Sequence, residues 1–192
     1  MGDVAAAETV AGGSIEPVYA DWRRYNTRIV AGLRGLTAND LTLSAAPDGW
    51  PVWAIAAHTA GARIYWLCGV FGEPGSASTP FPAADGEGWE DHLETTRTAA
   101  ELVGAFESSW RIVEGCLRRW TVPMLDEVFE RPLGDRVQRH TRQSVLLRLI
   151  THDAFHAGEI AQILGANGRP QFDLWPPQHA DPAANEARAA KG

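Results

Sequence analysis

Four stretches of the chain repeat apolar residues at intervals of three and four, the spacing that places them on one face of a helix. The pattern predicts helices from about Ser14 to Leu36, Pro51 to Val70, Thr98 to Trp120 and Thr141 to Asn167. Each helix would bury one apolar stripe and leave its opposite face polar. Because long amphipathic helices cover one another's apolar faces, the sequence predicts an all-α fold, a four-helix bundle.

The segments between these helices are rich in turn-forming residues. Residues 37–50 contain Asn-Asp, Ala-Pro and Asp-Gly pairs, which are typical of loops. Residues 72–97 predict a long crossover between the second and third helices, because a connection of this length is usually a crossover or a functional flap. Residues 126–140 predict a short β-ribbon before the last helix, with Glu127–Glu130 and Arg136–Gln138 joined by a turn.

Composition narrows the class of protein. The 192 residues predict one domain spanning 1–192, with a helical core at about 14–168 between a loose N-terminus and a Pro/Ala-rich tail. A net charge of −7 without a dense basic run argues against a nucleic-acid partner. The N-terminus lacks the order of a signal peptide, and no stretch approaches about 18 apolar residues, so no membrane span is expected. Two cysteines, Cys68 and Cys116, suit a reducing cytoplasm.

The most informative feature is the run from Leu149 to Ile160, which places His152 and His156 four residues apart in the last predicted helix. Residues at this spacing lie one turn apart on the same helix face, with Cβ atoms roughly 5–6 Å from each other. The pair falls within a predicted buried stripe, where an unpaired polar group costs about 1–3 kcal/mol. A metal ion bound by both imidazoles would satisfy both.

A third candidate ligand, His58, lies in the middle of the second predicted helix. It shares a helix face with Ile55, Ala62 and Tyr65. Bundle cores are a usual place for metal sites built from side chains on facing helices. Three neutral imidazoles would leave an open position on a zinc-like ion, the arrangement of a catalytic site. That position would bind water and lower its pKa, or bind a thiolate directly.

These histidines also have simpler interpretations. A single histidine in the middle of a helix, such as His58, is more often a core residue with a hydrogen-bond partner. Histidines four residues apart also occur on solvated helix faces. The remaining three, His92, His140 and His179, have polar neighbours or lie in the tail and are expected at the surface.

Acidic and basic residues near the histidines suggest further roles. Asp153 occupies the glutamate position of the metalloprotease pattern His-Glu-x-x-His, but its side chain is one methylene shorter, so we expect it to bind a histidine's second nitrogen or face solvent. Glu159, one turn beyond His156, could orient a ligand, act as a base beside bound water or ligate the ion. A salt bridge to an arginine is the alternative. Arg63 and Arg148 could receive a substrate carboxylate, although such arginines are more often solvated.

The order and context of these residues resemble the DinB/YfiT-like superfamily. The residues that carry the resemblance are Trp50, His58, His152, His156, Glu159 and Gly168. Proteins of this superfamily are four-helix bundles with a crossover between helices two and three, where residues 72–97 fall. The resemblance covers roughly residues 14–168.

The resemblance implies a divalent metal, most often zinc or nickel, bound by His58, His152 and His156. Its better-understood relatives are thiol-dependent transferases and isomerases that use bacillithiol or mycothiol, and several form homodimers. Two features depart from that pattern. The mycothiol-dependent isomerases have a glutamate in one ligand position, where this chain has histidine in all three, and Glu159 stands where many relatives have glutamine. The resemblance therefore supports a bound metal more directly than it supports mycothiol as the thiol.

The leading hypothesis is a cytoplasmic metal-dependent enzyme that activates a low-molecular-weight thiol toward a small electrophile, with Glu159 as a base or orienting group. The first alternative is a non-enzymatic, metal-binding or stress-related bundle. The second is metal-assisted hydrolysis with Asp153 or Glu159 as the base. The third is a bundle that binds no metal. Residues that would bind a cofactor other than the metal are not identified.

Overall fold

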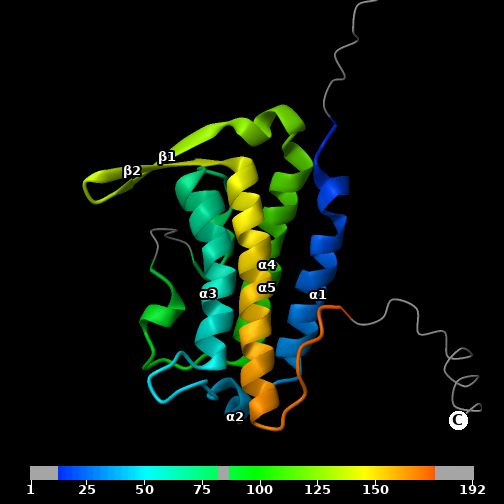
Figure 1. The fold of residues 1–192 in the computed structure, drawn as a ribbon, viewed down its shortest axis with the longest axis vertical. Coiled ribbons are helices and arrows are strands. Elements are labelled where there is room, and N and C mark those ends of the chain that lie inside the picture. Colours follow the sequence, from blue (N-terminus) through cyan, green and yellow to red (C-terminus); the bar gives the residue numbers. More distant parts are fainter. Residues whose placement is uncertain (1–12, 82–86, 176–192) are drawn as a thin grey trace, which may run out of the picture.

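A computed structural model describes residues 13–81 and 87–175 of the chain and shows a mainly helical architecture. Its long helices are α1 (Ala20–Arg34), α3 (Val52–Ile64), α4 (Ala99–Arg119) and α5 (Arg142–Ala166), and they run side by side (Figure 1). Helix α3 packs against α4 and α5, and α1 packs against α4. The helices lie where the apolar spacing predicts them, which confirms the mainly α-helical class.

Short helical segments complete the region around α1. The segment η1 (Glu16–Tyr19) leads into α1, and α2 (Ala38–Leu41) lies within the stretch predicted as a loop. That part of the prediction is wrong, because four residues carry too little periodicity to be recognised. A capping box fixes the first turn of α2: Thr37 Oγ1 accepts a hydrogen bond from Asp40 N at 3.2 Å, and Asp40 Oδ2 accepts one from Thr37 N at 2.9 Å.

Helix α3 changes its hydrogen-bonding pattern before it ends. It continues as a π-helical segment, η2 (Tyr65–Val70), where the sequence predicts uninterrupted α-helix. The amide of Phe71 donates to the carbonyl of Trp66, five residues earlier, at 3.1 Å. A π-helical turn changes the direction of the side chains around it and is often found at functional sites.

The crossover between η2 and α4 contains η3 (Ser76–Ser78) and η4 (Trp89–Asp91). The η4 turn packs against α3, and the segment runs along the outer side of that helix (Figure 1). Helix α4 then begins at a capping box, in which Thr98 Oγ1 accepts a hydrogen bond from Glu101 N at 3.3 Å and Glu101 accepts one from Thr98 N at 2.8 Å. The crossover thus brings its own side chains against α3.

A two-stranded antiparallel ribbon precedes α5, as the sequence predicts. After η5 (Val122–Asp126), β1 (Val128–Leu133) pairs with β2 (Arg136–Thr141), and the ribbon projects from one end of the helices (Figure 1). Thr141 ends β2 and also caps α5 by accepting a hydrogen bond from Ser144 N at 3.1 Å. The ribbon is therefore fixed directly to the start of α5.

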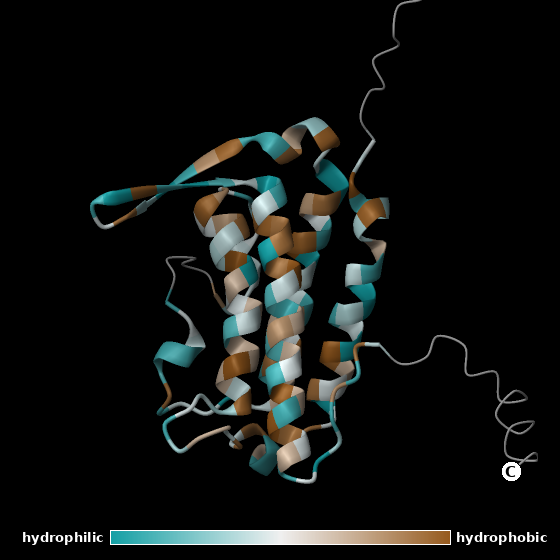
Figure 2. Cartoon of the chain, viewed as in Figure 1, coloured by the Kyte–Doolittle hydropathy of each residue, from teal (hydrophilic) through white to brown (hydrophobic). Residues whose placement is uncertain are grey.

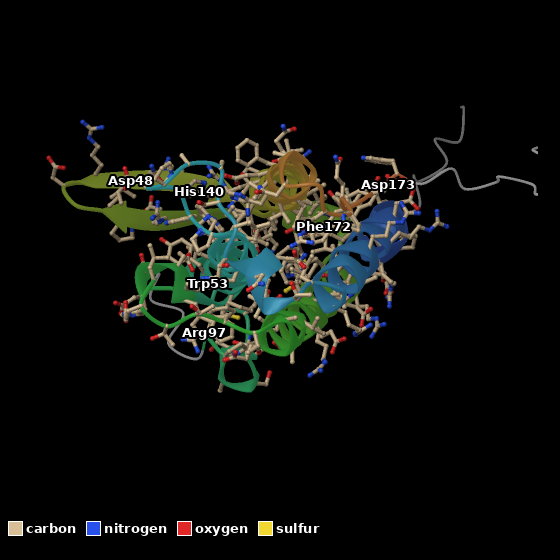
Figure 3. All side chains as sticks on the ribbon, turned by 90° about the horizontal axis from the view of Figure 1, so that it is seen from below. Asp48, Trp53, Arg97, His140, Phe172 and Asp173 are labelled. Carbon is tan, nitrogen blue, oxygen red and sulfur yellow. The ribbon has the colours of Figure 1, made fainter. Side chains whose placement is uncertain are left out.

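The apolar faces of the long helices form the core. Apolar and polar residues alternate along these helices (Figure 2). In the view along the helix axes, Trp53 lies among the helices (Figure 3). Five tryptophans are buried in this core: Trp22, Trp53, Trp66, Trp110 and Trp120. After α5 the chain returns between α5 and α1, where Phe172 covers Gly32 (Figure 3). A Cβ at position 32 would lie 2.4 Å from the Phe172 ring, so this approach requires glycine.

Within residues 13–81 and 87–175, none of the helices has the length and hydrophobicity required to cross a bilayer.

Candidate metal centre

Three histidine side chains from two helices meet in one cluster. His58 comes from α3, and His152 and His156 come from α5. One ring nitrogen of each lies within 4.8 Å of the others, and the Nε2 atoms of His58 and His152 are 3.0 Å apart. Nitrogens bound to one tetrahedral ion at 2.0–2.1 Å would lie about 3.3 Å apart. The structure thus brings together the three predicted ligands, while metal binding itself remains a prediction.

The apolar pattern of α5 explains why its two histidines face α3. Val145, Leu149 and Ile160 are each at most 1% exposed, and they share the helix face that carries His152 and His156. Burying this stripe against α3 necessarily turns both imidazoles toward that helix. His156 itself is buried, and His152 is half-buried.

Two carboxylates orient two of the three rings. His58 Nδ1 lies 2.7 Å from Glu90 Oε1, and His156 Nδ1 lies 2.8 Å from Glu159 Oε2. A neutral imidazole that donates its Nδ1 hydrogen to a carboxylate keeps the Nε2 lone pair free for a metal. Both rings therefore have the hydrogen-bonding pattern typical of metal-ligating histidines.

The third ring lacks a comparable partner. His152 Nδ1 is buried and has no hydrogen-bond partner among the described residues. Burial, followed by the charges of His156 and His58, lowers the pKa of His152 from 6.5 to about 3. Burial also lowers the pKa of His156, although the hydrogen bond with Glu159 acts in the opposite direction. Both groups are thereby kept in the neutral form that a metal requires, so this donor set fits a divalent ion such as zinc.

Two aromatic side chains flank the cluster on its solvent side. The Trp50 ring lies 5.0 Å from the His58 ring, and the Phe155 ring lies 5.0 Å from the His156 ring, measured between centroids. Phe155 is 69% exposed and Trp50 is 38% exposed, so each ring lies against an imidazole and also faces solvent.

A cavity of about 580 Å³ lies next to the cluster. His58, His152 and Glu90 form one part of its wall, and Tyr65, Trp66, Arg131 and Arg148 form another. A small molecule in this cavity could therefore contact the imidazoles directly. The volume falls within the range of small-molecule sites in proteins.

The expectations for Asp153 and Arg63 are wrong. Asp153 is 1% exposed, and its Oδ2 accepts hydrogen bonds from Arg63 Nη2 and Trp22 Nε1, both at 2.7 Å. It neither binds a histidine nitrogen nor faces solvent, because its side chain points into the core. Arg63 is fully buried beside it and cannot receive a substrate carboxylate. With both oxygens of Asp153 bonded to Arg63, a role as hydrolytic base loses its support.

Glu159 lies where its spacing predicts, one turn beyond His156, and its carboxylate contacts that ring. No ion pair between Glu159 and an arginine occurs in the described part of the chain. Glu90, which contacts His58 in the same way, was missed by the sequence analysis. It lies 32 residues after His58 in the crossover, and the unusual length of that connection was the one available signal.

The chain is similar to known proteins in sequence and in fold. A family model described as the DinB superfamily matches residues 20–160. The chain is also similar to the crystal structure of a DinB-like protein from Bacillus cereus ATCC 10987, with a TM-score of 0.61 and 18% sequence identity over 81% of this chain and 93% of that chain. At this identity the likeness shows a shared fold alone. The search of curated proteins found no match.

Proposed function

The chain belongs to the DinB superfamily, and from that premise we propose that it binds a divalent metal and transfers a low-molecular-weight thiol to a small electrophile. The observation that carries the proposal is the convergence of His58, His152 and His156. In this proposal the four long helices act as a four-helix bundle that holds the site. Neutral imidazole ligands suit zinc and nickel equally, so both remain candidates.

The chemistry of the site would depend on the ion. A divalent ion bound by three histidines would lower the pKa of a thiol and so supply a thiolate nucleophile at neutral pH. In the transfer, the thiol proton passes to a base or to solvent, the sulfur bonds to the electrophilic carbon, and the leaving group departs with its electron pair. The cavity would hold the electrophile against the site.

The surrounding residues act by positioning. Glu90 and Glu159 fix the His58 and His156 rings with Nε2 directed into the cluster, and we assign both as positioning residues. Because Glu159 Oε2 is engaged with His156 Nδ1, we favour orientation over proton abstraction as its role. Trp50 and Phe155 would limit the access of water.

Mycothiol and bacillithiol are the thiols that we propose to test first, because thiol-dependent relatives use them. We also propose a cytoplasmic location, with which the free thiols Cys68 and Cys116 are compatible, and a homodimeric state. Size-exclusion chromatography coupled to light scattering would test the dimer.

The function is tested by thiol-conjugation assays on metal-loaded protein with mycothiol, bacillithiol and glutathione against a panel of electrophiles. We expect turnover with at least one thiol, and its loss in His156→Ala. His140→Gln is the matched control, because His140 lies outside the three-histidine cluster. Bound metal without conjugation of any thiol would refute the transferase and leave metal binding intact.

A non-enzymatic metal-binding role is the second candidate, favoured by the position of the cluster between α3 and α5. One ion there would link two helices that are far apart in sequence. Metal removal would then strongly lower the melting temperature, and no electrophile would be turned over.

A further inference from the structure

Two arginines line the cavity from different elements: Arg131 from β1 and Arg148 from α5. Both guanidinium groups lie against the same ring, since their Cζ atoms are 5.5 and 4.9 Å from the centroid of Trp66. Among the described residues, neither arginine has a carboxylate within ion-pair distance. Most other described arginines do have one.

The contacts of Arg131 hold its side chain without neutralising its charge. Its Nε donates to the hydroxyl oxygen of Tyr65, and its Nη1 donates to Gln138 Oε1 at 2.9 Å. Both acceptors are uncharged. Because Tyr65 accepts this bond, its own hydroxyl hydrogen can be donated to a molecule in the cavity.

The positive charge of the two arginines acts on one small region. The His140 ring lies 4.7 Å from the Trp66 ring, and burial together with the charges of Arg148 and Arg131 lowers the pKa of His140. Arg131 is half-buried and Arg148 is exposed, and no described carboxylate pairs with either of these two cations on the cavity wall. An anion bound there would compensate them.

The distance between this wall and the histidines sets the size of such a ligand. Arg148 precedes His152 by one helical turn, about 6 Å along α5. Tyr65, at the start of η2, follows His58 by two turns, about 10 Å along the helix axis. Apolar side chains of Ile64, Phe81 and Leu149 also line the cavity. The ligand would thus have an apolar body roughly 6–10 Å long.

We propose that Arg131, Arg148 and the Tyr65 hydroxyl form a carboxylate-binding subsite, here called the arginine subsite. It binds the carboxylate of a small organic acid and directs the other end of that molecule toward the three histidines. Guanidinium groups match a carboxylate in shape and charge and never deprotonate in this context. The role of the far end rests on the proposed function, whereas carboxylate binding does not.

Acidic side chains line the cavity from the crossover and favour one orientation of the ligand. They are Glu87 and Glu90, of which Glu90 is bonded to His58 at the histidine end. Its charge repels a second carboxylate when no metal is present, and the arginine subsite attracts one. An organic acid therefore enters with its carboxylate toward Arg131 and Arg148.

The test is isothermal titration calorimetry on chelator-treated protein with 4-phenylbutanoate and its uncharged amide, 4-phenylbutanamide. We expect the acid to bind at least tenfold more tightly than the amide. Arg131→Gln and Arg148→Gln should each weaken the acid at least tenfold and change the amide less than twofold. Arg136→Gln is the matched control, because it removes the same charge from the ribbon at a position that does not line the cavity. Equal affinity of wild-type protein for acid and amide would overturn the proposal, whatever the variants do.

A second arm identifies the molecule that carries the carboxylate. Zinc-loaded protein is titrated with 4-mercaptobutanoate and 4-mercaptobutanamide, so that a carboxylate preference in this pair assigns the acid to the thiol, and one limited to the phenyl pair assigns it to the electrophile. His156→Ala separates this proposal from the proposed function. That variant should lose the metal and still prefer 4-phenylbutanoate over its amide. Loss of the preference in folded His156→Ala would contradict an independent arginine subsite.

Discussion

Two clusters of polar side chains join α3 to α5, and they are built on consecutive residues of α5. Asp153 points into the core and pairs with Arg63, whereas His152 points to the cavity side and meets His58. Both clusters therefore join the same two helices, but one lies in the core and the other lies beside the cavity. They differ in whether protein groups alone provide hydrogen-bond partners for the polar atoms.

The core cluster is complete. Arg63 donates to both oxygens of Asp153, at 3.3 and 2.7 Å, and to Asn26 Oδ1 at 2.7 Å. The Trp22 indole donates a further bond to Asp153, and the Arg63 guanidinium lies 5.0 Å from the Phe106 ring. A buried ion pair whose hydrogen bonds are all made holds its side chains in one arrangement. Substitution of either partner strongly lowers the stability of the fold.

The histidine cluster is not complete. Its imidazoles direct nitrogens at one another, and His152 Nδ1 lacks a partner within the part of the chain described. Lone pairs that face each other need a shared proton or a cation. Burial alone therefore does not separate a polar cluster that protein groups complete from one whose ring nitrogens converge without a described partner for every atom.

The largest expected effect is on the core cluster. Asp153→Ala leaves the Arg63 charge buried without its partner and should lower the free energy of unfolding by about 3–5 kcal/mol. Urea unfolding measures this. Glu130→Ala removes an exposed ion pair with Arg139 and should cost less than about 1 kcal/mol. Similar losses for the two variants would mean that Arg63 and Asp153 do not form a buried pair.

Zinc should stabilise the histidine cluster and not the core cluster. At a free zinc concentration of 100 times Kd, the free energy of unfolding should rise by about 2.7 kcal/mol. Thermal melts with zinc and with a chelator measure the difference. His152→Asn should abolish it and His140→Gln should keep it. An equal zinc effect in His152→Asn would place the ion elsewhere.

The carboxylates that orient the rings should contribute less than the rings themselves. Glu90→Gln and Glu159→Gln are expected to weaken zinc binding about 10- to 100-fold, as is usual for partners of ligating histidines. Glu90 should have the larger effect, because its side chain is 10% exposed and that of Glu159 is 38% exposed. Competition titrations with a zinc indicator provide the affinities. Glu130→Gln is the control, and unchanged affinity in both test variants would remove their positioning role.

The smallest effect is that of a change of one pH unit. Because the pKa of His152 is lowered to about 3 in the folded protein, the unfolded chain takes up the proton first as pH falls below about 6.5. The stabilising contribution of neutral His152 is therefore complete above pH 6.5 and is lost progressively toward pH 3. Metal-free protein should lose on the order of 1 kcal/mol per pH unit in this window. His152→Asn should show a shallower dependence in urea unfolding, and identical slopes would argue against a buried neutral imidazole.

Apolar periodicity was sufficient to predict the long helices, and two short segments on either side of a turn predicted the ribbon. Periodicity also placed His152 and His156 on the buried face of α5, because a stripe that includes Val145, Leu149 and Ile160 allows one orientation. The predicted helix start at Thr98 coincides with the N-cap of α4. These are local signals, which a sequence states directly.

Contacts between distant segments were not predictable in the same way. Nothing in the sequence around Asp153 distinguishes a side chain that binds a neighbouring histidine from one that pairs with Arg63, 90 residues earlier. Glu90 reaches His58 only through the path of the crossover, and Arg131 reaches the cavity only through the ribbon. Such pairings depend on tertiary packing, which periodicity does not describe.

The most direct test of the account is elemental analysis of freshly purified wild-type protein and His156→Ala. Three converging imidazoles predict about one zinc or nickel ion per wild-type chain and almost none in the variant. Equal metal content in the two proteins, or none in either after loading, would contradict the three-histidine centre.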